Sequence, residues 1–142
     1  MEDVLKEKLW LYIINNNPDL MFTLQEEYRV SEYLNEKIVT VKSIVDELLE
    51  EATPQYIIEE ICLNLLTEDL KPSRYVYIRL LLEEEFQSNY NQFYESGILI
   101  YEVINLVESC KEVFETIGFT NENEDNTFLK HAIIGQMAVY LN

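Results

Sequence analysis

The stretch IYEVINLVESCKEVFETIG, residues 100–118, has the clearest helical pattern in the chain. Its apolar residues recur at steps of three and four, which places them on one face of an α-helix. Gly118 follows the last of them, at the position where many helices end in a left-handed residue. The pattern predicts an amphipathic helix of about five turns. Its apolar face would consist of Ile100, Val103, Ile104, Val107, Cys110, Phe114 and Ile117.

Five more stretches carry helical signals. The segment 24–51 has a long apolar stripe, and its β-branched run KIVTVKSIV fits the helical period better than a strand, with a break expected near residues 30–31. Thr53 before Pro54 and Ser73 after Pro72 are helix starts, because threonine and serine cap the first turn. The predicted helices cover residues 3–15, 24–51, 53–66, 73–94, 100–117 and 127–141, and the polar run TNENEDN (120–126) predicts a loop.

The fold class follows from this arrangement. Amphipathic helices with short connections bury their apolar faces against one another, and the chain has only three glycines and three prolines, too few for the many turns of an all-β fold. We therefore expect an all-α fold, a compact bundle of about five to six helices. No linker or internal repeat divides the 142 residues, so residues 1–142 are expected to form a single helical domain.

The formal net charge of −17, from 27 acidic and 10 basic residues, restricts the partners of the protein. An acidic surface repels phosphate backbones and anionic lipids, so we expect no direct nucleic-acid binding and no membrane partner. Solubility alone accounts for such a charge. A sharper alternative is that the carboxylates imitate the phosphates of a nucleic acid.

The cysteines and the beginning of the chain indicate a cytoplasmic protein. The opening MEDVLKEKLWLYII begins with acidic residues rather than the basic region of a signal peptide, and no apolar run approaches the ~20 residues that span a bilayer. Cys62 and Cys110 lie in apolar helical runs, as buried free thiols do.

Most catalytic and metal-binding arrangements lack their residues. His131 is the one histidine, Phe128 stands where a Glu-x-x-His motif needs its glutamate, and the three glycines are too scattered for a phosphate-binding loop. A pair of His131 with a cysteine, and cation binding by the acidic clusters at 46–51 and 121–125, are weaker interpretations than a surface histidine and solvated carboxylates. We therefore expect no catalytic, cofactor-binding or metal-binding residue and no enzymatic activity. An enzyme that uses paired glutamates remains a third hypothesis.

The stretch KPSRYVYIRLLLEEEF, residues 71–86, contains the candidate recognition surface. Its basic residues come at the helix start and its glutamates at the end, an order that the helix dipole disfavours. The arginines are therefore expected to contact acidic groups elsewhere in the fold or on a partner. The candidate residues are Arg74, Tyr75, Tyr77 and Arg79.

Together with LVESCKEVF (106–114), the same stretch resembles an uncharacterised family of small all-helical proteins from Bacteroidetes-type bacteria, known as a domain of unknown function. The shared layout includes NNPDL (16–20), Glu-Glu-Phe (84–86) and Cys-x-x-Val-Phe (110–114), and it covers nearly the whole chain. The segment 25–48 is less rich in alanine than expected of relatives. The resemblance implies a helical fold and a bacterial cytoplasmic origin, and it transfers no catalytic residue because the family has no assigned activity.

These observations favour a non-enzymatic acidic helical protein that acts through protein–protein contacts, with a homodimer as one form of such contact. Ten tyrosines support this interpretation, because exposed tyrosines suit interfaces. The alternative is an acidic inhibitor that imitates a nucleic acid and occupies the site of a DNA- or RNA-binding protein.

Overall fold

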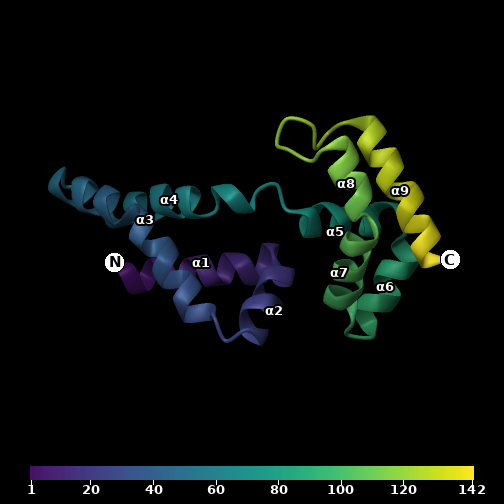
Figure 1. The fold of residues 1–142 in the computed structure, drawn as a ribbon, viewed down its shortest axis with the longest axis horizontal. Coiled ribbons are helices and arrows are strands. Elements are labelled where there is room, and N and C mark those ends of the chain that lie inside the picture. The colour runs from purple at the N-terminus through teal and green to yellow at the C-terminus, as the bar shows by residue number, and fades with distance from the viewer. The chain divides into compact units, whose positions relative to one another are not determined.

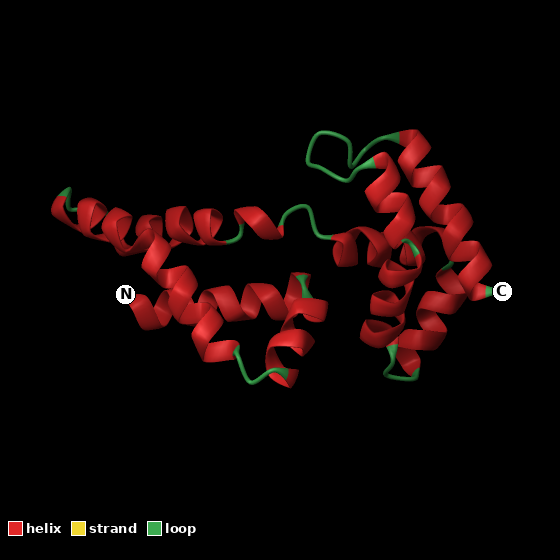
Figure 2. Ribbon diagram, viewed as in Figure 1, coloured by secondary structure: helices red, strands yellow, loops and turns green.

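The computed structural model describes residues 1–142, and every regular element in it is helical, which confirms the all-α fold (Figure 1, Figure 2). There are nine α-helices and one short 3-10 helix, η1. The elements are α1 (Glu2–Asn16), α2 (Pro18–Glu26), α3 (Val30–Glu50), α4 (Gln55–Leu66), η1 (Glu68–Leu70), α5 (Arg74–Glu85), α6 (Gln87–Glu95), α7 (Leu99–Ser109), α8 (Lys111–Ile117) and α9 (Thr127–Leu141).

The predicted number of five to six helices is wrong, because three of the predicted long helices are each interrupted. The segment 24–51 belongs to α2 and α3, the segment 73–94 to α5 and α6, and the segment 100–117 to α7 and α8. Phe86 separates α5 from α6 with φ −135° and ψ 52°, and Cys110 separates α7 from α8 with ψ 2°. The break between α2 and α3 lies at residues 27–29, close to the break expected near residues 30–31. Apolar periodicity continues through the one-residue breaks at Phe86 and Cys110, so the sequence pattern does not reveal those two.

Pro18 has a role that the sequence analysis missed. The run NNNP ends α1, as predicted, but Pro18 is also the first residue of α2. Proline fits there because its missing N–H would have no intrahelical acceptor and its fixed φ suits the first turn.

The chain divides into two compact units, each with a core of its own. Unit 1 comprises residues 1–70, and its helices α1, α3 and α4 pack around one core with α2 against α1 and α3. The buried residues of this core are Leu5, Leu9, Ile13, Leu34, Ile38, Val41, Val45, Ile58, Cys62 and Leu66. Burying a side chain of this size contributes about 1.5–3 kcal/mol, which makes these residues the main stabilising contacts of unit 1.

Unit 2 comprises residues 71–142 and builds a second core from α5 to α9. Helix α5 packs on α6 and α7, and α9 packs on α7 and α8 (Figure 1). The buried residues are Tyr75, Ile78, Leu81, Leu82, Val103, Leu106, Cys110, Phe114, Leu129, Ile133 and Met137. The expectation of a single domain stays a prediction, because compactness alone does not show whether the two units fold together.

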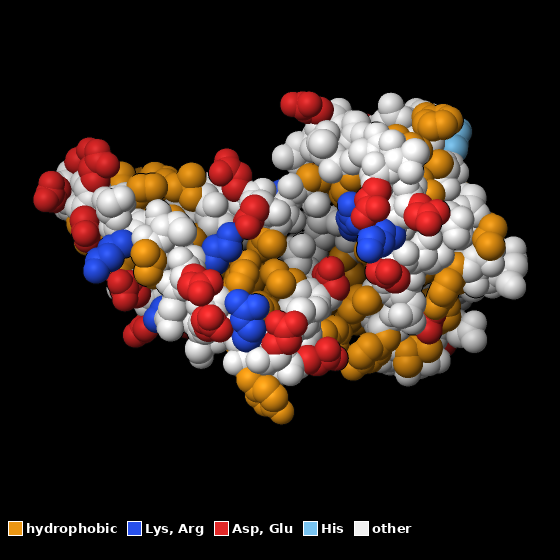
Figure 3. Space-filling view, viewed as in Figure 1, with side chains coloured by type: hydrophobic (Ala, Val, Ile, Leu, Met, Phe, Trp, Pro, Cys, Tyr) orange, Lys and Arg blue, Asp and Glu red, His pale blue; other side chains and the backbone are white.

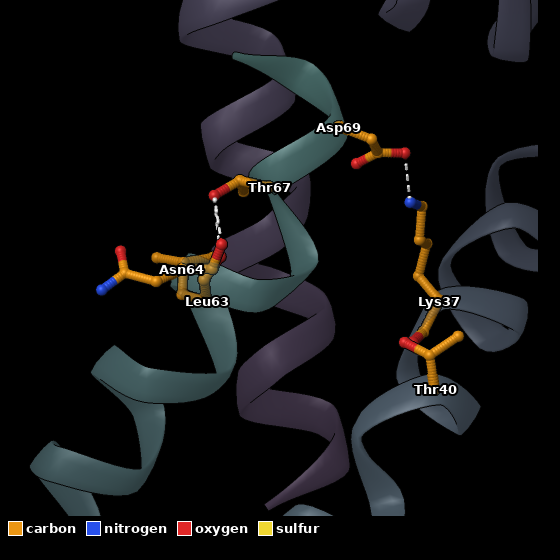
Figure 4. A network of polar contacts seen from close by, with 6 residues as sticks. All are labelled: Lys37, Thr40, Leu63, Asn64, Thr67 and Asp69. Carbon is orange, nitrogen blue, oxygen red and sulfur yellow. Dashed lines mark hydrogen bonds and ion pairs between the residues drawn. The ribbon is translucent and has the colours of Figure 1, made fainter. Parts of the chain in front are cut away.

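The end of unit 1 is fixed by polar contacts of η1 and the residues before it (Figure 4). The Thr67 hydroxyl donates a hydrogen bond of 2.8 Å to the Leu63 carbonyl, which satisfies a side chain that is only 1% exposed. The Lys37 ammonium donates to the Asp69 carboxylate at 2.6 Å and so joins η1 to α3. These contacts hold the residues that follow Leu66 against the core of unit 1.

Two helices end in the left-handed conformation on residues other than glycine. Tyr28 has φ 56° and Ala52 has φ 57°. In both turns the next N–H donates to the carbonyl five residues back, Arg29 to Leu24 at 2.9 Å and Thr53 to Leu48 at 3.0 Å. This is the Schellman pattern, in which glycine is the favoured left-handed residue because a Cβ is strained there.

We predict that Ala52→Gly raises the free energy of unfolding by about 1 kcal/mol, because it removes the cost of a left-handed alanine. The matched control is Ala138→Gly within α9, where the same substitution should lower it by about 1 kcal/mol. Urea unfolding monitored by circular dichroism measures both variants. A loss of stability in Ala52→Gly equal to that of the control would contradict the assignment of this turn.

Candidate functional site

The predicted recognition surface lies on the first turns of α5. The Ser73 hydroxyl accepts a hydrogen bond of 3.1 Å from the Val76 N–H, which confirms the predicted helix cap. The Arg74 guanidinium lies over the ring of Phe114, 5.0 Å from its centroid, so this arginine makes a cation–π contact within unit 2. Arg74 and Arg79 are both half-buried.

The two tyrosines of this surface are part of the packing of unit 2. Tyr75 is 7% exposed, and burial raises the pKa of its hydroxyl although the charge of Arg79 lowers it. Tyr77 packs edge-on against Phe114 and Phe119, with ring centroids 6.0 and 5.0 Å apart. Its buried hydroxyl has no hydrogen-bond partner, and an unsatisfied buried group costs about 1–3 kcal/mol. The four residues therefore do not form one exposed patch, and their role in recognition stays a prediction.

The two thiols are buried in different cores. Burial raises the pKa of the Cys62 thiol and raises the pKa of Cys110 from 9.0 to about 11. A thiol with such a pKa stays protonated at neutral pH and is a poor nucleophile. His131 is exposed on α9 and forms no hydrogen bond with either cysteine, and no group of three or more His, Cys, Asp or Glu side chains could hold a metal ion.

A cluster of carboxylates without any basic residue lies around the turn that joins α3 to α4. We call residues 46–60 the acidic tip. It contains six carboxylates and no lysine, arginine or histidine. Of these, Glu59 pairs with Lys8 at 3.1 Å. The remaining carboxylates are exposed and form no ion pair, and they are Asp46, Glu47, Glu50, Glu51 and Glu60.

The placement of these carboxylates is electrostatically unfavourable. Glu47 and Glu50 lie in the last turn of α3, which has no basic residue, and Glu51 is its C-terminal cap residue. The C-terminal end of a helix carries a partial negative charge, so each carboxylate there costs about 0.3–1 kcal/mol. Nothing within unit 1 offsets this cost with a positive side chain.

Exposed apolar side chains lie among these carboxylates. Leu49, in the last turn of α3, is 53% exposed, and Tyr56, in the first turn of α4, is 70% exposed. The residues between them form the turn that joins the two helices, so both side chains lie at the same end of the unit. Figure 3 shows hydrophobic atoms (orange) between acidic side chains (red) at this end of α3 and α4.

Sequence reasoning considered the carboxylates at 46–51 only for cation binding and missed the full extent of the acidic tip, although a signal was present. Residues 43–70 contain eight carboxylates and no base, which a count over short windows reveals. The exposure of Tyr56 could not be foreseen, because Ile57 and Ile58 beside it suggested that α4 buries this region.

No helix is both long and apolar enough to cross a membrane. Comparisons with protein-family models, curated proteins and solved structures found no match to this chain. The resemblance to the small helical bacterial family therefore stays a prediction.

The pKa of Cys110 predicts how stability changes at high pH. Because the folded-state pKa lies above the ordinary value, the contribution of the thiol is fully present below pH 9 and is lost as the pH rises toward about 11. We expect the free energy of unfolding to fall over this range by up to about 2–3 kcal/mol from this group. In Cys110→Ala the free energy of unfolding, measured by urea unfolding between pH 8 and 11, should fall less steeply with pH than in the wild type. An equal dependence on pH in both proteins would contradict the raised pKa of Cys110.

Proposed function

We propose that the protein is a non-enzymatic binding protein that contacts a basic protein segment through the acidic tip. The observation that carries this proposal is the crowding of unpaired carboxylates at the C-terminal end of α3, beside two exposed apolar side chains. A partner with lysines or arginines would relieve the repulsion at the helix end and cover Leu49 and Tyr56.

The chemistry of the partner can be inferred by comparing how much ion pairs and apolar contacts contribute to the free energy of binding. An exposed ion pair contributes about 0–1 kcal/mol and is weakened by salt, so the carboxylates mainly accelerate and orient the encounter. Truncating a well-packed interface tyrosine costs more than about 1 kcal/mol. The fitting partner is therefore an amphipathic helix with basic residues on either side of an apolar stripe.

The same carboxylates favour a second candidate function, imitation of a nucleic acid. A mimic needs negative charge and does not depend on contacts with Tyr56 or Leu49. The two functions therefore differ in whether binding depends on the apolar pattern of the partner.

A peptide-binding experiment tests the proposal. The probes are a fluorescently labelled amphipathic peptide of leucine and lysine and a scrambled peptide of the same composition, and fluorescence anisotropy measures their affinities. We expect the chain to bind the amphipathic peptide at least ~10-fold more tightly, and Tyr56→Ala to weaken that binding by about 10-fold. The matched control is Tyr94→Ala, because Tyr94 is 67% exposed but lies in unit 2.

The outcomes separate the candidates. Equal affinity for both peptides, together with no effect of Tyr56→Ala and loss of binding when Glu47, Glu50 and Glu51 become glutamine, would contradict the docking of a helix and support the mimic. Absence of binding to either peptide would contradict both.

A further inference from the structure

Helix α9 differs from the rest of the chain in charge. All 27 aspartates and glutamates lie in residues 1–125, so residues 126–142 form the longest stretch without a carboxylate. Lys130 and His131 are the only titratable side chains of α9 that can carry a positive charge. Most other parts of the chain carry acidic side chains at shorter intervals, so two copies that met there would bring carboxylates together.

The outward face of α9 is mostly apolar, with exposed His131 as its polar residue. Leu129, Ile133 and Met137 are fully buried in unit 2. On the opposite side of the helix, Phe128 is 71% exposed and Val139 is 72% exposed. Ala132 and Gly135 lie between them on the same side of the helix. The steps of four, three and four residues are those of the contact line between two paired helices, and we call Phe128, Ala132, Gly135 and Val139 the seam.

The centre of this seam is made of small residues. Gly135 is exposed in the middle of a helix, and a Cβ built there would meet no atom within 4 Å. Nothing inside unit 2 therefore requires glycine, although glycine disfavours helix formation relative to alanine. A small residue at such a position allows the backbone of another helix to approach closely.

We propose that the outward face of α9 pairs with the same face of a second copy, in antiparallel orientation around a two-fold axis. In this register Phe128 lies opposite Val139 of the second copy, and Ala132 lies opposite Gly135 of the second copy. The face is self-complementary, as a two-fold interface requires, since its large side chains stand at the ends and its small ones at the centre. The absence of acidic side chains favours a second copy, because two chains of net charge −17 can meet here without placing Asp or Glu against Asp or Glu. A single helix pair is a small interface, so the dimer is expected to be reversible.

This inference goes beyond the proposed function, because it concerns a different unit and a different partner. Sedimentation velocity of the full chain over a series of protein concentrations tests it. We expect the wild type to shift from monomer to dimer with concentration, and added salt to strengthen the dimer by screening the repulsion between copies. Val139→Glu should weaken dimerisation by at least ~10-fold, because it places a carboxylate in the apolar seam.

The matched control is Val39→Glu on α3, which changes the charge equally at a valine that is 69% exposed. A second variant, Gly135→Leu, should abolish the dimer while the melting temperature of the monomer at low concentration is maintained or raised, since leucine is a good helix former. A wild type that stays monomeric at every soluble concentration, or equal dimerisation by Val139→Glu and Val39→Glu, would overturn the proposal whatever the peptide experiment shows.

Discussion

Burial of one apolar stripe per helix is the constraint on which the rest of this structure depends. The helices are interrupted, because the chain leaves the helical conformation at Asn17, Phe86 and Cys110 and between Leu70 and Arg74. Residues 1–70 and 71–142 each bury the apolar stripes of their helices in a core of their own. Each unit buries the inner stripe of its helices and leaves the outer faces to solvent or to partners.

The two outer faces that stand out differ in their electrostatics. The acidic tip combines exposed Leu49 and Tyr56 with carboxylates at the negative end of α3, so a basic partner would remove a repulsion that the fold itself leaves in place. The outward face of α9 has no carboxylate and presents Phe128 and Val139 to solvent. We thus propose that the acidic tip attracts a partner of opposite charge, and that the outward face of α9 lets two copies meet without repulsion between carboxylates.

The fold class could be predicted from the sequence because helical periodicity and the caps at Ser73 and Gly118 are local signals. The number of helices could not, since the apolar stripe of residues 100–117 continues through the turn at Cys110 without a change of period. The candidate site on α5 was predicted from residue types alone. The stretch RYVYIRLLL (74–82) offers Tyr75 and Tyr77, and the packing of the core, not the residue type, decides that Tyr75 is buried. Exposure depends on the arrangement of several helices, so the exposed apolar side chains of the acidic tip and of the α9 face were not found from one segment of sequence.

Both proposals hold that the apolar faces outside the two cores are contact sites for other protein chains. Hydroxyl-radical footprinting of the wild-type chain, with mass spectrometry of oxidised side chains at low and high protein concentration, tests it most directly. We expect Phe128 to be oxidised more slowly at high concentration, while Tyr28, which is 96% exposed and far from α9 in sequence, keeps its rate. An oxidation rate of Phe128 that does not change with concentration would show that this face forms no contact between copies of the chain.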